Sequence, residues 1–391
     1  MIRKILHIDL DAFFCSVEEL KDPSLKGKAF AVGGGADQRG VISTCSYAAR
    51  LYGVRSAMPT AQAFKLCPHL LLLRGHYAEY EIYSHQVMDI LCDLSPLVEI
   101  VSIDEAFVDI SDLPDPSERL ALQIQQRIEK ETQLPVSIGG ATSKLVAKVA
   151  TDAGKMKQRK GEAPKAITIV PPGKEIEFLA PLSVQAIWGV GPKSAAHFNQ
   201  NGIYTIADLQ SLSIARLKGI VGNNAQYLYD AVRGIDSSPV RVEHGMKSIS
   251  QETTFEKDVN DMDELQEVLT HLARKTVRRL RTHHYCADTV RIKIRLHDFS
   301  TYTRQISLKV PTDVESIILK HAQDLLLAFY KPEHQVRLLG VGVSGLQESW
   351  HQMGLWEENI EKEIRLHVAL DELQDRFGKN AIQRGKTKSH G

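Results

Sequence analysis

The sequence predicts an α+β protein made of several domains. In residues 1–170, short apolar β-branched runs alternate with stretches whose apolar residues recur at helical spacing. Pro171-Pro172-Gly173 interrupts this pattern, and residues 173–236 then read as short helices joined at glycines. Residues 247–346 return to a mixture of strand and helix patterns. The 391-residue chain is long enough for roughly two to four domains with cores of their own.

Within the first segment, β-branched and apolar runs predict strands at 4–10, 28–33, 40–44, 70–73, 98–103, 106–111, 135–140 and 166–170. Helical spacing predicts helices at 15–20, 46–52, 59–67, 76–94, 117–132 and 143–153. The helix at 117–132 is a clear case, because Leu120, Ile124 and Ile128 recur every four residues.

The third segment begins after a second break near Ser237-Ser238-Pro239. Its predicted strands are 247–255, 287–298, 302–310 and 335–345, and its predicted helices are 261–282 and 313–330. The tail, residues 347–391, is polar and partly helical. Within it, residues 362–384 read as one amphipathic helix with Leu366, Leu370, Leu373 and Phe377 on its apolar side.

Composition excludes several classes of protein. The chain is 43% hydrophobic and 25% charged, which is ordinary for a soluble globular protein. It lacks a run of about eighteen apolar residues that could span a membrane, and it starts directly in a strand pattern rather than a secretory signal. Its five cysteines are scattered, with no CxxC pair. We therefore expect a cytoplasmic protein with free thiols and no zinc site.

Basic residues are unevenly distributed, although 48 Lys and Arg cancel 48 Asp and Glu overall. From Arg274 to Lys309 there are ten basic residues against two acids, and from Lys144 to Lys160 six against one. Such runs can simply be solvated helix faces. Here the first run continues from a predicted helix into a predicted strand, which favours a track for a nucleic-acid phosphate backbone.

Two carboxylate clusters adjoin predicted strands. Asp9 and Asp11 lie near the end of the first strand, and Asp104 and Glu105 lie between two others. Carboxylates at the ends of buried strands cost folding free energy unless a cation binds them. Two such strands side by side could hold a pair of Mg²⁺ ions about 4 Å apart, the arrangement used for displacement at phosphorus. The alternative is that Asp9 and Asp104 merely end strands.

Gly189-Val190-Gly191 lies between two helical patterns and is followed by Pro192 and Lys193. Backbone N–H groups of such a hairpin, at the start of a helix, can face a phosphate. Residues 217–222 look like a weaker second copy. This favours a helix-hairpin-helix DNA clamp over a plain turn between helices.

Over roughly residues 1–345 the chain resembles the Y-family DNA polymerases of the DinB, or DNA polymerase IV, class. The resemblance rests on motifs in family order: Asp9-Leu10-Asp11-Ala12-Phe13-Phe14, Ser16-Val17-Glu18, Pro23–Lys28, Ser46-Tyr47-Ala48-Ala49-Arg50, Gly53-Val54, Met58-Pro59, Ser102-Ile103-Asp104-Glu105-Ala106, the Lys144–Lys155 helix and Gly189-Val190-Gly191.

The resemblance implies a right-hand polymerase with a ferredoxin-like palm, small fingers, a helical helix-hairpin-helix thumb and a mixed α/β little finger. The implied ranges are 1–11 and 75–170 for the palm, 12–74 for the fingers, 171–236 for the thumb, 237–246 for a linker, 247–346 for the little finger and 347–391 for the tail.

The implied reaction is attack by a primer 3′-hydroxyl on the α-phosphorus of a deoxynucleoside triphosphate. Asp9, Asp104 and Glu105, with the Leu10 carbonyl, would hold two Mg²⁺ ions, for which oxygen ligands are suited. Strand periodicity alone could also make Asp11 a ligand, but the family pattern does not.

The resemblance also implies nucleotide contacts. Tyr47 and Arg50, three residues apart on one helix face, would bind the β- and γ-phosphates with Thr44 just ahead, and Lys155 would reach the same triphosphate. The ring of Phe14 would exclude a ribose hydroxyl as a steric gate, whereas Phe13 faces the core. Small residues over the base pair (Val32, Val41 and Ala57) imply low fidelity and translesion synthesis, and no length remains for a proofreading domain.

The chain departs from the family around one of these positions. Ser143 stands where the family usually has Asn. Lys155-Met156-Lys157-Gln158 replaces the usual Lys-Pro-x-Gly, and a basic insertion follows it up to Lys165.

DNA contacts are expected at Gly189, Gly191, Lys193, Lys247, Arg291, Lys293 and Arg295. The peptide Gln352-Met353-Gly354-Leu355-Trp356 resembles those that dock bacterial polymerases on a sliding clamp, through Gln352, Leu355 and Trp356. We expect a monomer that binds primer–template DNA, a deoxynucleotide and this clamp, but no membrane. Two alternatives stay open: a catalytically silent DNA-binding accessory paralogue that recruits partners, and a nucleotide cyclase.

Overall fold

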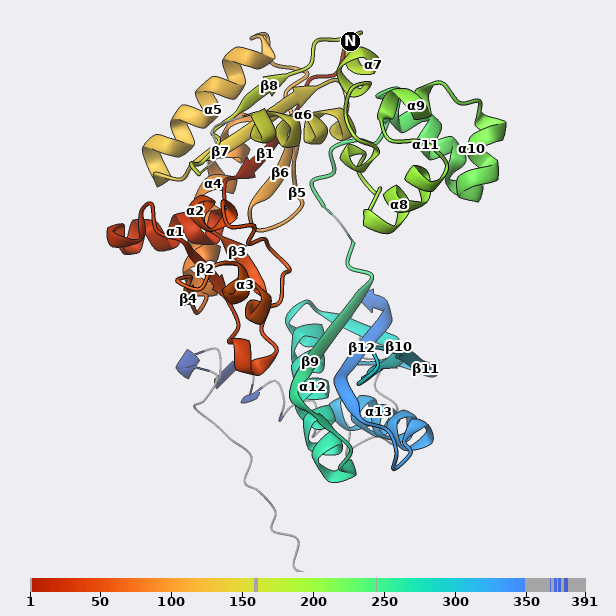
Figure 1. Cartoon of the computed structure of the whole chain (residues 1–391). Helices are drawn as coiled ribbons and strands as arrows, with labels where there is room; N and C mark the ends of the chain where they lie inside the picture. Colours follow the sequence, from red (N-terminus) through yellow and green to blue (C-terminus); the bar gives the residue numbers. More distant parts are fainter. Residues whose placement is uncertain are drawn as a thin grey trace, which may run out of the picture. The chain divides into compact units, whose positions relative to one another are not determined.

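The computed structural model describes residues 2–157, 161–243 and 245–348, and a few positions between 366 and 378. The chain forms two compact units, Met1–His244 and Gly245–Gly391 (Figure 1). Both units mix helices and strands, so the predicted α+β multidomain fold is confirmed.

The largest sheet of the first unit has five strands: β1 (Ile5–Leu10), β5 (Val98–Ile100), β6 (Glu105–Asp109), β7 (Val136–Ala141) and β8 (Ile167–Ile169). Their order is β5-β6-β1-β7-β8, with β1 antiparallel to both of its neighbours. Side chains alternate along β1 because successive strand residues face opposite ways. Leu6, Ile8 and Leu10 pack with α4 (Tyr77–Leu94) and α5 (Ser117–Thr132), whereas Ile5 packs with α6 (Lys144–Lys157).

A smaller sheet, β3-β2-β4, joins β2 (Phe30–Gly33), β3 (Ile42–Cys45) and β4 (Leu71–Leu73). Around it lie α1 (Phe13–Lys21), η1 (Pro23–Leu25), η2 (Ala36–Gln38), α2 (Tyr47–Arg50) and α3 (Thr60–Leu66). This part has a core of small side chains, including Ala31, Ala49 and Ala63. Phe30 and Val32 of β2 also belong to the core of the five-stranded sheet, so the small sheet packs partly on its own core and partly on that one.

The first unit ends in short helices: α7 (Glu175–Leu179), η3 (Val184–Ala186), α8 (Pro192–Gln200), α9 (Ile206–Gln210), α10 (Ile214–Val221), η4 (Gly222–Asn224) and α11 (Ala225–Ala231). Leu179, Phe198 and Leu228 share one core with Val146 of α6, which ties these helices to the five-stranded sheet. After them, the Arg3 guanidinium donates to the carbonyls of Asp236 and Ser238, and the Arg241 N–H donates to Glu99. The start of the expected 237–246 linker is therefore bound to the first unit.

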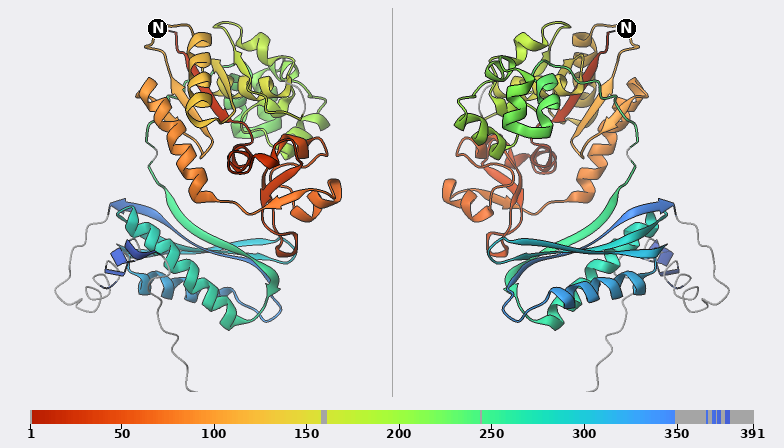
Figure 2. Two further views of the ribbon diagram at one scale, coloured as in Figure 1. Left: turned by 90° about the vertical axis from the view of Figure 1, so that its left-hand side faces the viewer. Right: turned by 90° about the vertical axis from the view of Figure 1, so that its right-hand side faces the viewer.

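The second unit is one antiparallel sheet of order β11-β10-β12-β9, formed by β9 (Ser248–Val259), β10 (Tyr285–Leu296), β11 (Thr301–Thr312) and β12 (Val336–Glu348). Helices α12 (Met262–Thr282) and α13 (Glu315–Phe329) lie on one face of the sheet (Figure 2). Val290, Ile292 and Ile294 point into the core beneath them. The opposite face is not covered by any helix of residues 245–348, and we call it the open face.

One helix begins earlier than predicted, and one strand prediction is wrong. Phe13 and Phe14 form the start of helix α1, ahead of the predicted start at residue 15, because the chain turns at Ala12, whose φ of 45° is left-handed. The predicted strand 98–103 stops at Ile100, since the N–H groups of Val101 and Ser102 both bond to the Glu105 carbonyl in a tight turn.

All five cysteines are free thiols. Among the residues that the structure describes, no helix is both long and apolar enough to cross a bilayer.

Candidate active site

The two acidic strands are neighbours. Asp9 of β1 lies directly opposite Glu105 of β6, and the Leu10 N–H donates to the Asp104 carbonyl at 2.9 Å. The antiparallel register thus brings together the carboxylates that the sequence predicts as one cluster. Every one of them sits at the same end of the β1–β6 pair.

Asp104 sits in the turn before β6. The Ser102 hydroxyl donates to its Oδ1 at 2.5 Å. Burial raises the pKa of Asp104, and the negative charges of Asp9 and Glu105 raise that pKa further, against the opposing effect of the Ser102 hydrogen bond. A carboxylate in this position gains from any cation that approaches it.

Glu105 is held by two donors. Its Oε1 accepts from His7 Nε2 at 2.7 Å and from Lys148 Nζ at 2.5 Å. Burial alone would raise the pKa of Glu105, but these two hydrogen bonds and charges lower it to about 2. Glu105 is therefore ionised at neutral pH.

Asp9 and Asp11 share one lysine. The Lys155 ammonium lies 2.5 Å from Asp9 Oδ1 and 3.1 Å from Asp11 Oδ1. Although burial lowers the pKa of Lys155, the two carboxylates raise it above the ordinary value. The sequence predicted that Lys155 binds the triphosphate. In the structure its ammonium group forms ion pairs with these two carboxylates.

Asp11 is fully buried and saturated with hydrogen bonds. The Ser137 hydroxyl lies 2.9 Å from both of its oxygens, and the Lys165 N–H donates to Oδ2. These donors make Asp11 a structural anchor for the chain near Lys165, which agrees with its exclusion from the expected ligands.

The donor chemistry of the cluster suits a hard divalent cation. Asp9 Oδ2, Asp104 Oδ2 and Glu105 Oε2 each accept no hydrogen bond from the described residues, because the donors occupy the other oxygen. Carboxylate oxygens are the ligands that Mg²⁺ prefers. In the described ranges, however, no three His, Cys, Asp or Glu side chains are grouped closely enough to hold a metal ion. The metal-ligand role of Asp9, Leu10, Asp104 and Glu105 stays a prediction.

The expected phosphate-binding residues lie together at the small sheet. Thr44 is in β3, Ser46 caps α2 by accepting the Ala49 N–H, and Tyr47 and Arg50 begin and end that helix. The Arg50 guanidinium stacks 4.4 Å from the centroid of the Tyr47 ring. Burial and the nearby Asp11 raise the pKa of Tyr47, so its hydroxyl keeps its proton. A protonated phenol and an exposed guanidinium are both donors for phosphate oxygens.

The Phe14 ring stacks on Tyr80, with centroids 4.3 Å apart and an angle of 14° between the planes. The Tyr80 hydroxyl donates to Glu18 at 2.5 Å, which anchors α1 to α4. Phe14 is half-buried, whereas Phe13 is in the core, as expected. Val32 is fully buried and therefore cannot cover a base pair as expected, although Val41 is 46% exposed.

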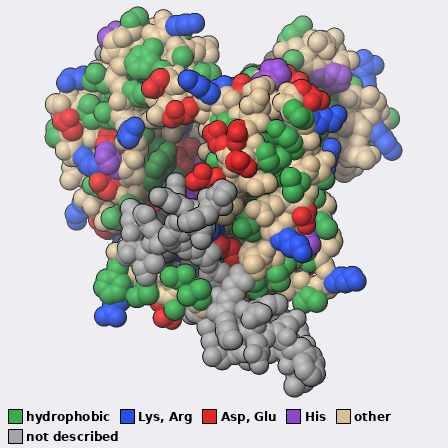
Figure 3. Space-filling view, turned by 90° about the horizontal axis from the view of Figure 1, so that it is seen from below, with side chains coloured by type: hydrophobic (Ala, Val, Ile, Leu, Met, Phe, Trp, Pro, Cys, Tyr) green, Lys and Arg blue, Asp and Glu red, His purple; other side chains and the backbone are tan. Residues whose placement is uncertain are grey.

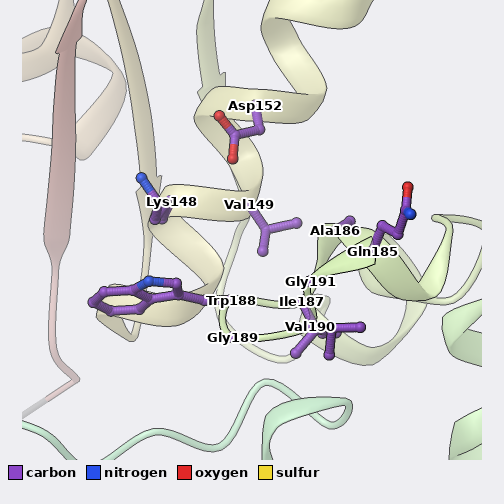
Figure 4. A pocket seen from close by; sticks show the side chains of 10 residues that line it. All are labelled: Lys148, Val149, Asp152, Gln185, Ala186, Ile187, Trp188, Gly189, Val190 and Gly191. Atoms are coloured by element: carbon purple, nitrogen blue, oxygen red, sulfur yellow. The ribbon is translucent and has the colours of Figure 1, made fainter. Parts of the chain in front are cut away.

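A cavity of about 400 Å³ separates α6 from the loop before α8 (Figure 4). Lys148 and Asp152 line it on the α6 side, and Trp188, Gly189 and Gly191 line it on the loop side. Gly189 has a φ of 90°, which favours glycine there. Lys193 is exposed in the first turn of α8, where a phosphate could approach.

The predicted DNA-binding residues of β10 lie on the open face. Arg291, Lys293 and Arg295 alternate with the buried Val290, Ile292 and Ile294. Lys293 pairs with Glu252 at 2.8 Å, and Lys247 is exposed just before β9. Figure 3, seen from below the view of Figure 1, shows acidic and basic side chains interspersed over that side of the molecule.

The first basic run, from Arg274 to Lys309, does not form the single stripe from helix into strand that the sequence suggested. The basic residues of α12 lie on the helix-covered side of the sheet, away from Arg291, Lys293 and Arg295, because α12 packs through Leu269, Val277 and similar residues. In the 144–160 run, Lys144 pairs with the buried Glu99, and Lys148 and Lys155 pair with the half-buried Glu105 and Asp9.

Three polar partners were missed by sequence reasoning: His7, Thr151 and Glu99. His7 bonds Glu105 and Thr151, and Glu99 forms a buried ion pair with Lys144 at 2.8 Å. His7 and Glu99 each interrupt an apolar strand pattern, and that interruption was the available signal. The expected clamp-binding residues Gln352, Leu355 and Trp356 lie outside the described residues.

Three family models match the chain: the impB/mucB/samB family over residues 8–152, its C-terminal domain over 246–355, and the thumb domain of DNA polymerase-iota over 185–236. A DNA polymerase IV of Desulfatibacillum aliphaticivorans is 38% identical over 387 residues, covering 97% of this chain and 95% of that protein. A DNA polymerase IV of Dehalococcoides mccartyi (strain CBDB1) is 38% identical over 390 residues, covering 99% of this chain and 98% of that protein.

Solved structures share the fold. A Y-family DNA polymerase chimera of Dbh and Dpo4 matches with a TM-score of 0.77 and 23% identity, covering 88% of this chain and 100% of that chain. DinB of Sulfolobus solfataricus matches with a TM-score of 0.59 and 25% identity, covering 87% of this chain and 98% of that chain.

Proposed function

The chain belongs to the impB/mucB/samB family of Y-family DNA polymerases, of the DNA polymerase IV class, and from this premise we propose how its residues extend a primer. It is a DNA-directed DNA polymerase of the translesion type. We propose two-metal phosphoryl transfer to a primer 3′-hydroxyl, with low fidelity and without proofreading.

The register of Asp9 opposite Glu105, with Asp104 beside Leu10, is the observation that carries the proposed chemistry. Asp9, Asp104, Glu105 and the Leu10 carbonyl would hold the two Mg²⁺ ions. When bound there, the ions activate the attacking hydroxyl and stabilise the leaving oxygen. The side chains themselves fix where the cations collect and keep that end of the sheet negatively charged.

Substrate binding is proposed at three places. Thr44, Tyr47 and Arg50 would hold the triphosphate, because phenol and guanidinium groups donate to phosphate oxygens. Lys155 is proposed to exchange its carboxylate partners for the triphosphate. Primer–template DNA would be held by the backbone around Gly189 and Gly191, by Lys193 and Lys247, and by the basic residues of the open face (Arg291, Lys293 and Arg295).

A primer-extension assay tests the function. With a primed template, deoxynucleotides and Mg²⁺, we expect elongation of the primer, and EDTA should abolish it because the carboxylates alone cannot activate the hydroxyl. Retention of DNA without any extension would instead support the accessory paralogue. Conversion of a nucleoside triphosphate into a cyclic product would support the cyclase.

Replacing Phe14 by Ala should raise the use of ribonucleotides. The shortened side chain leaves room for a 2′-hydroxyl, so we expect the ratio of ribonucleotide to deoxynucleotide kcat/KM to rise at least about tenfold. Single-nucleotide insertion kinetics measure this ratio. Tyr52→Ala, which removes an exposed aromatic side chain of the small-sheet part, is the control and should leave it unchanged. An unaltered ratio in Phe14→Ala removes the steric-gate assignment.

The clamp proposal has its own test. A Leu355→Ala, Trp356→Ala double variant should lose the processivity gain that a bacterial sliding clamp gives, because a short motif docks through its apolar pair. Product lengths with and without the clamp measure this gain, and extension without the clamp should not change. Stimulation equal to that of the unmodified protein would count against the motif.

We further propose a monomeric, cytoplasmic enzyme. The proposed low fidelity requires a loose fit around the base pair, to which Val41, 46% exposed, would contribute a short aliphatic side chain.

A further inference from the structure

His7 is a buried polar residue of β1 that the proposed mechanism does not use. It lies two positions before Asp9, and no part of it is exposed. Its ring packs against Phe107 with centroids 4.8 Å apart. A histidine enclosed in this way needs a partner for each ring nitrogen, since an unpaired buried polar group is costly.

Both nitrogens have such a partner. Nδ1 lies 2.8 Å from Thr151 Oγ1, and Nε2 lies 2.7 Å from Glu105 Oε1. An ionised carboxylate only accepts hydrogen bonds, so Nε2 carries the proton that is donated to Glu105, and the Thr151 hydroxyl can serve Nδ1 in either direction. The imidazole ring is thereby fixed between a helix and the strand that carries Glu105.

The position of Thr151 depends on a close approach of α6 to β7. A Cβ atom on Gly139 would lie 2.1 Å from the Ala147 carbonyl oxygen and 2.5 Å from Thr151 Oγ1. Only glycine permits this spacing, which brings Thr151 within reach of His7. Three residues of α6 then meet three strand residues in order: Lys148 with Glu105, Thr151 with His7, and Lys155 with Asp9.

The consequence for Glu105 is an asymmetric carboxylate. Oε1 accepts hydrogen bonds from both His7 and Lys148, whereas Oε2 accepts no hydrogen bond from the described residues. Two donors on one oxygen restrict rotation of the carboxylate and leave the other oxygen available. Groups that orient a ligand in this way typically change metal affinity or activity by about 10–100-fold when they are removed.

We propose that His7 is a positioning residue, which holds Glu105 through Oε1 so that Oε2 is presented to a divalent metal ion. The proposal rests on the proposed function. His7 does not touch the substrate or the reacting atoms, and it acts only through Glu105.

Two substitutions separate positioning from simple packing. His7→Phe keeps a ring against Phe107 but removes the donor, whereas His7→Gln keeps an N–H donor of similar reach. Mn²⁺ titration of the full-length protein, read by electron paramagnetic resonance, reports affinity without any catalysis. We expect the Mn²⁺ dissociation constant of His7→Phe to rise by about 10–100-fold, and that of His7→Gln to stay close to that of the unmodified protein.

Kinetics and a packing control complete the test. In primer extension, kcat of His7→Phe should fall by a similar factor with an unchanged KM for the deoxynucleotide, and His7→Gln should recover most of kcat. Ile5→Val, on the same strand face, should lower the thermal midpoint without altering Mn²⁺ affinity or kcat.

Unaltered Mn²⁺ binding in His7→Phe, or a Gln variant no better than the Phe variant, overturns the proposal and makes His7 a core residue only. Absence of primer extension by the unmodified protein refutes the proposed function instead, and the Mn²⁺ titrations still decide the role of His7.

Discussion

Asp104→Asn is expected to lower kcat of primer extension by about 10²–10³-fold, the range observed when one electrostatic contact of a transition state is removed. The amide keeps the size of the carboxylate and can still meet the Ser102 hydroxyl. It lacks the negative charge that a divalent ion needs. Rapid-quench measurement of single-nucleotide insertion gives kcat directly.

The same substitution should not destabilise the protein. In the absence of metal, Asp104 is half-buried beside Asp9 and Glu105, and burial and these like charges raise its pKa. Neutralising it relieves that repulsion, so we expect a thermal midpoint in EDTA equal to or above that of the unmodified protein. Loss of function with gain of stability is characteristic of a catalytic carboxylate.

Asp109→Asn is the matched control for Asp104→Asn. Asp109 lies at the far end of β6, the strand that follows Asp104, four residues beyond Glu105, and accepts hydrogen bonds from the N–H and hydroxyl of Ser111. Its kcat should equal that of the unmodified protein. Equal kcat values for Asp104→Asn and Asp109→Asn would exclude Asp104 from the metal site.

The largest effect on stability is expected at the buried ion pair of Glu99 and Lys144. The ammonium contacts both carboxylate oxygens, at 2.8 and 2.9 Å, and both side chains are less than one-tenth exposed. Glu99→Gln leaves the lysine charge buried with a neutral partner. Removing one partner of such a pair costs about 3–5 kcal/mol, so we expect the unfolding free energy of the first unit to fall by that amount.

A double replacement provides the control for this pair. Lys144→Met with Glu99→Gln removes both charges while an amide oxygen can still accept from the Arg241 N–H, and removing both charges of a buried pair is often neutral or better. Urea unfolding followed by Trp188 fluorescence, with Trp350 and Trp356 changed to Phe, measures the first unit. A double variant as unstable as Glu99→Gln would show that lost packing, and not the isolated charge, determines the cost.

The strands and helices could largely be predicted from the sequence because their periodicities are local. The period-two alternation of Leu6, Ile8 and Leu10 with Ile5, His7 and Asp9 defines two strand faces before any partner is known. The turn at Ala12 could not be predicted in this way, because apolar residues continue through it into α1. The early end of β5 likewise depends on Ser102 and Glu105 closing a turn.

Partners of charged side chains could not be predicted from the sequence. Lys144, Lys148 and Lys155 form part of a basic run, yet each pairs with a specific buried or half-buried acid from another element. That choice depends on the packing of α6 against the sheet, which Gly139 permits and no local pattern reveals. Val32 is likewise buried by contacts between separate elements, since it packs into the core that contains Leu10 and Phe13.

Lys148 and Lys155 also bear on how the protein comes to be folded. Their ammonium groups offset part of the negative charge of Glu105, Asp9 and Asp11 with charges carried by the chain itself. The protein can therefore fold around this acidic cluster in the absence of magnesium. Zinc fingers, in contrast, remain unfolded until they bind their ion. We therefore expect chelation of the metal to leave the protein folded but inactive, and activity to recover when Mg²⁺ is added back.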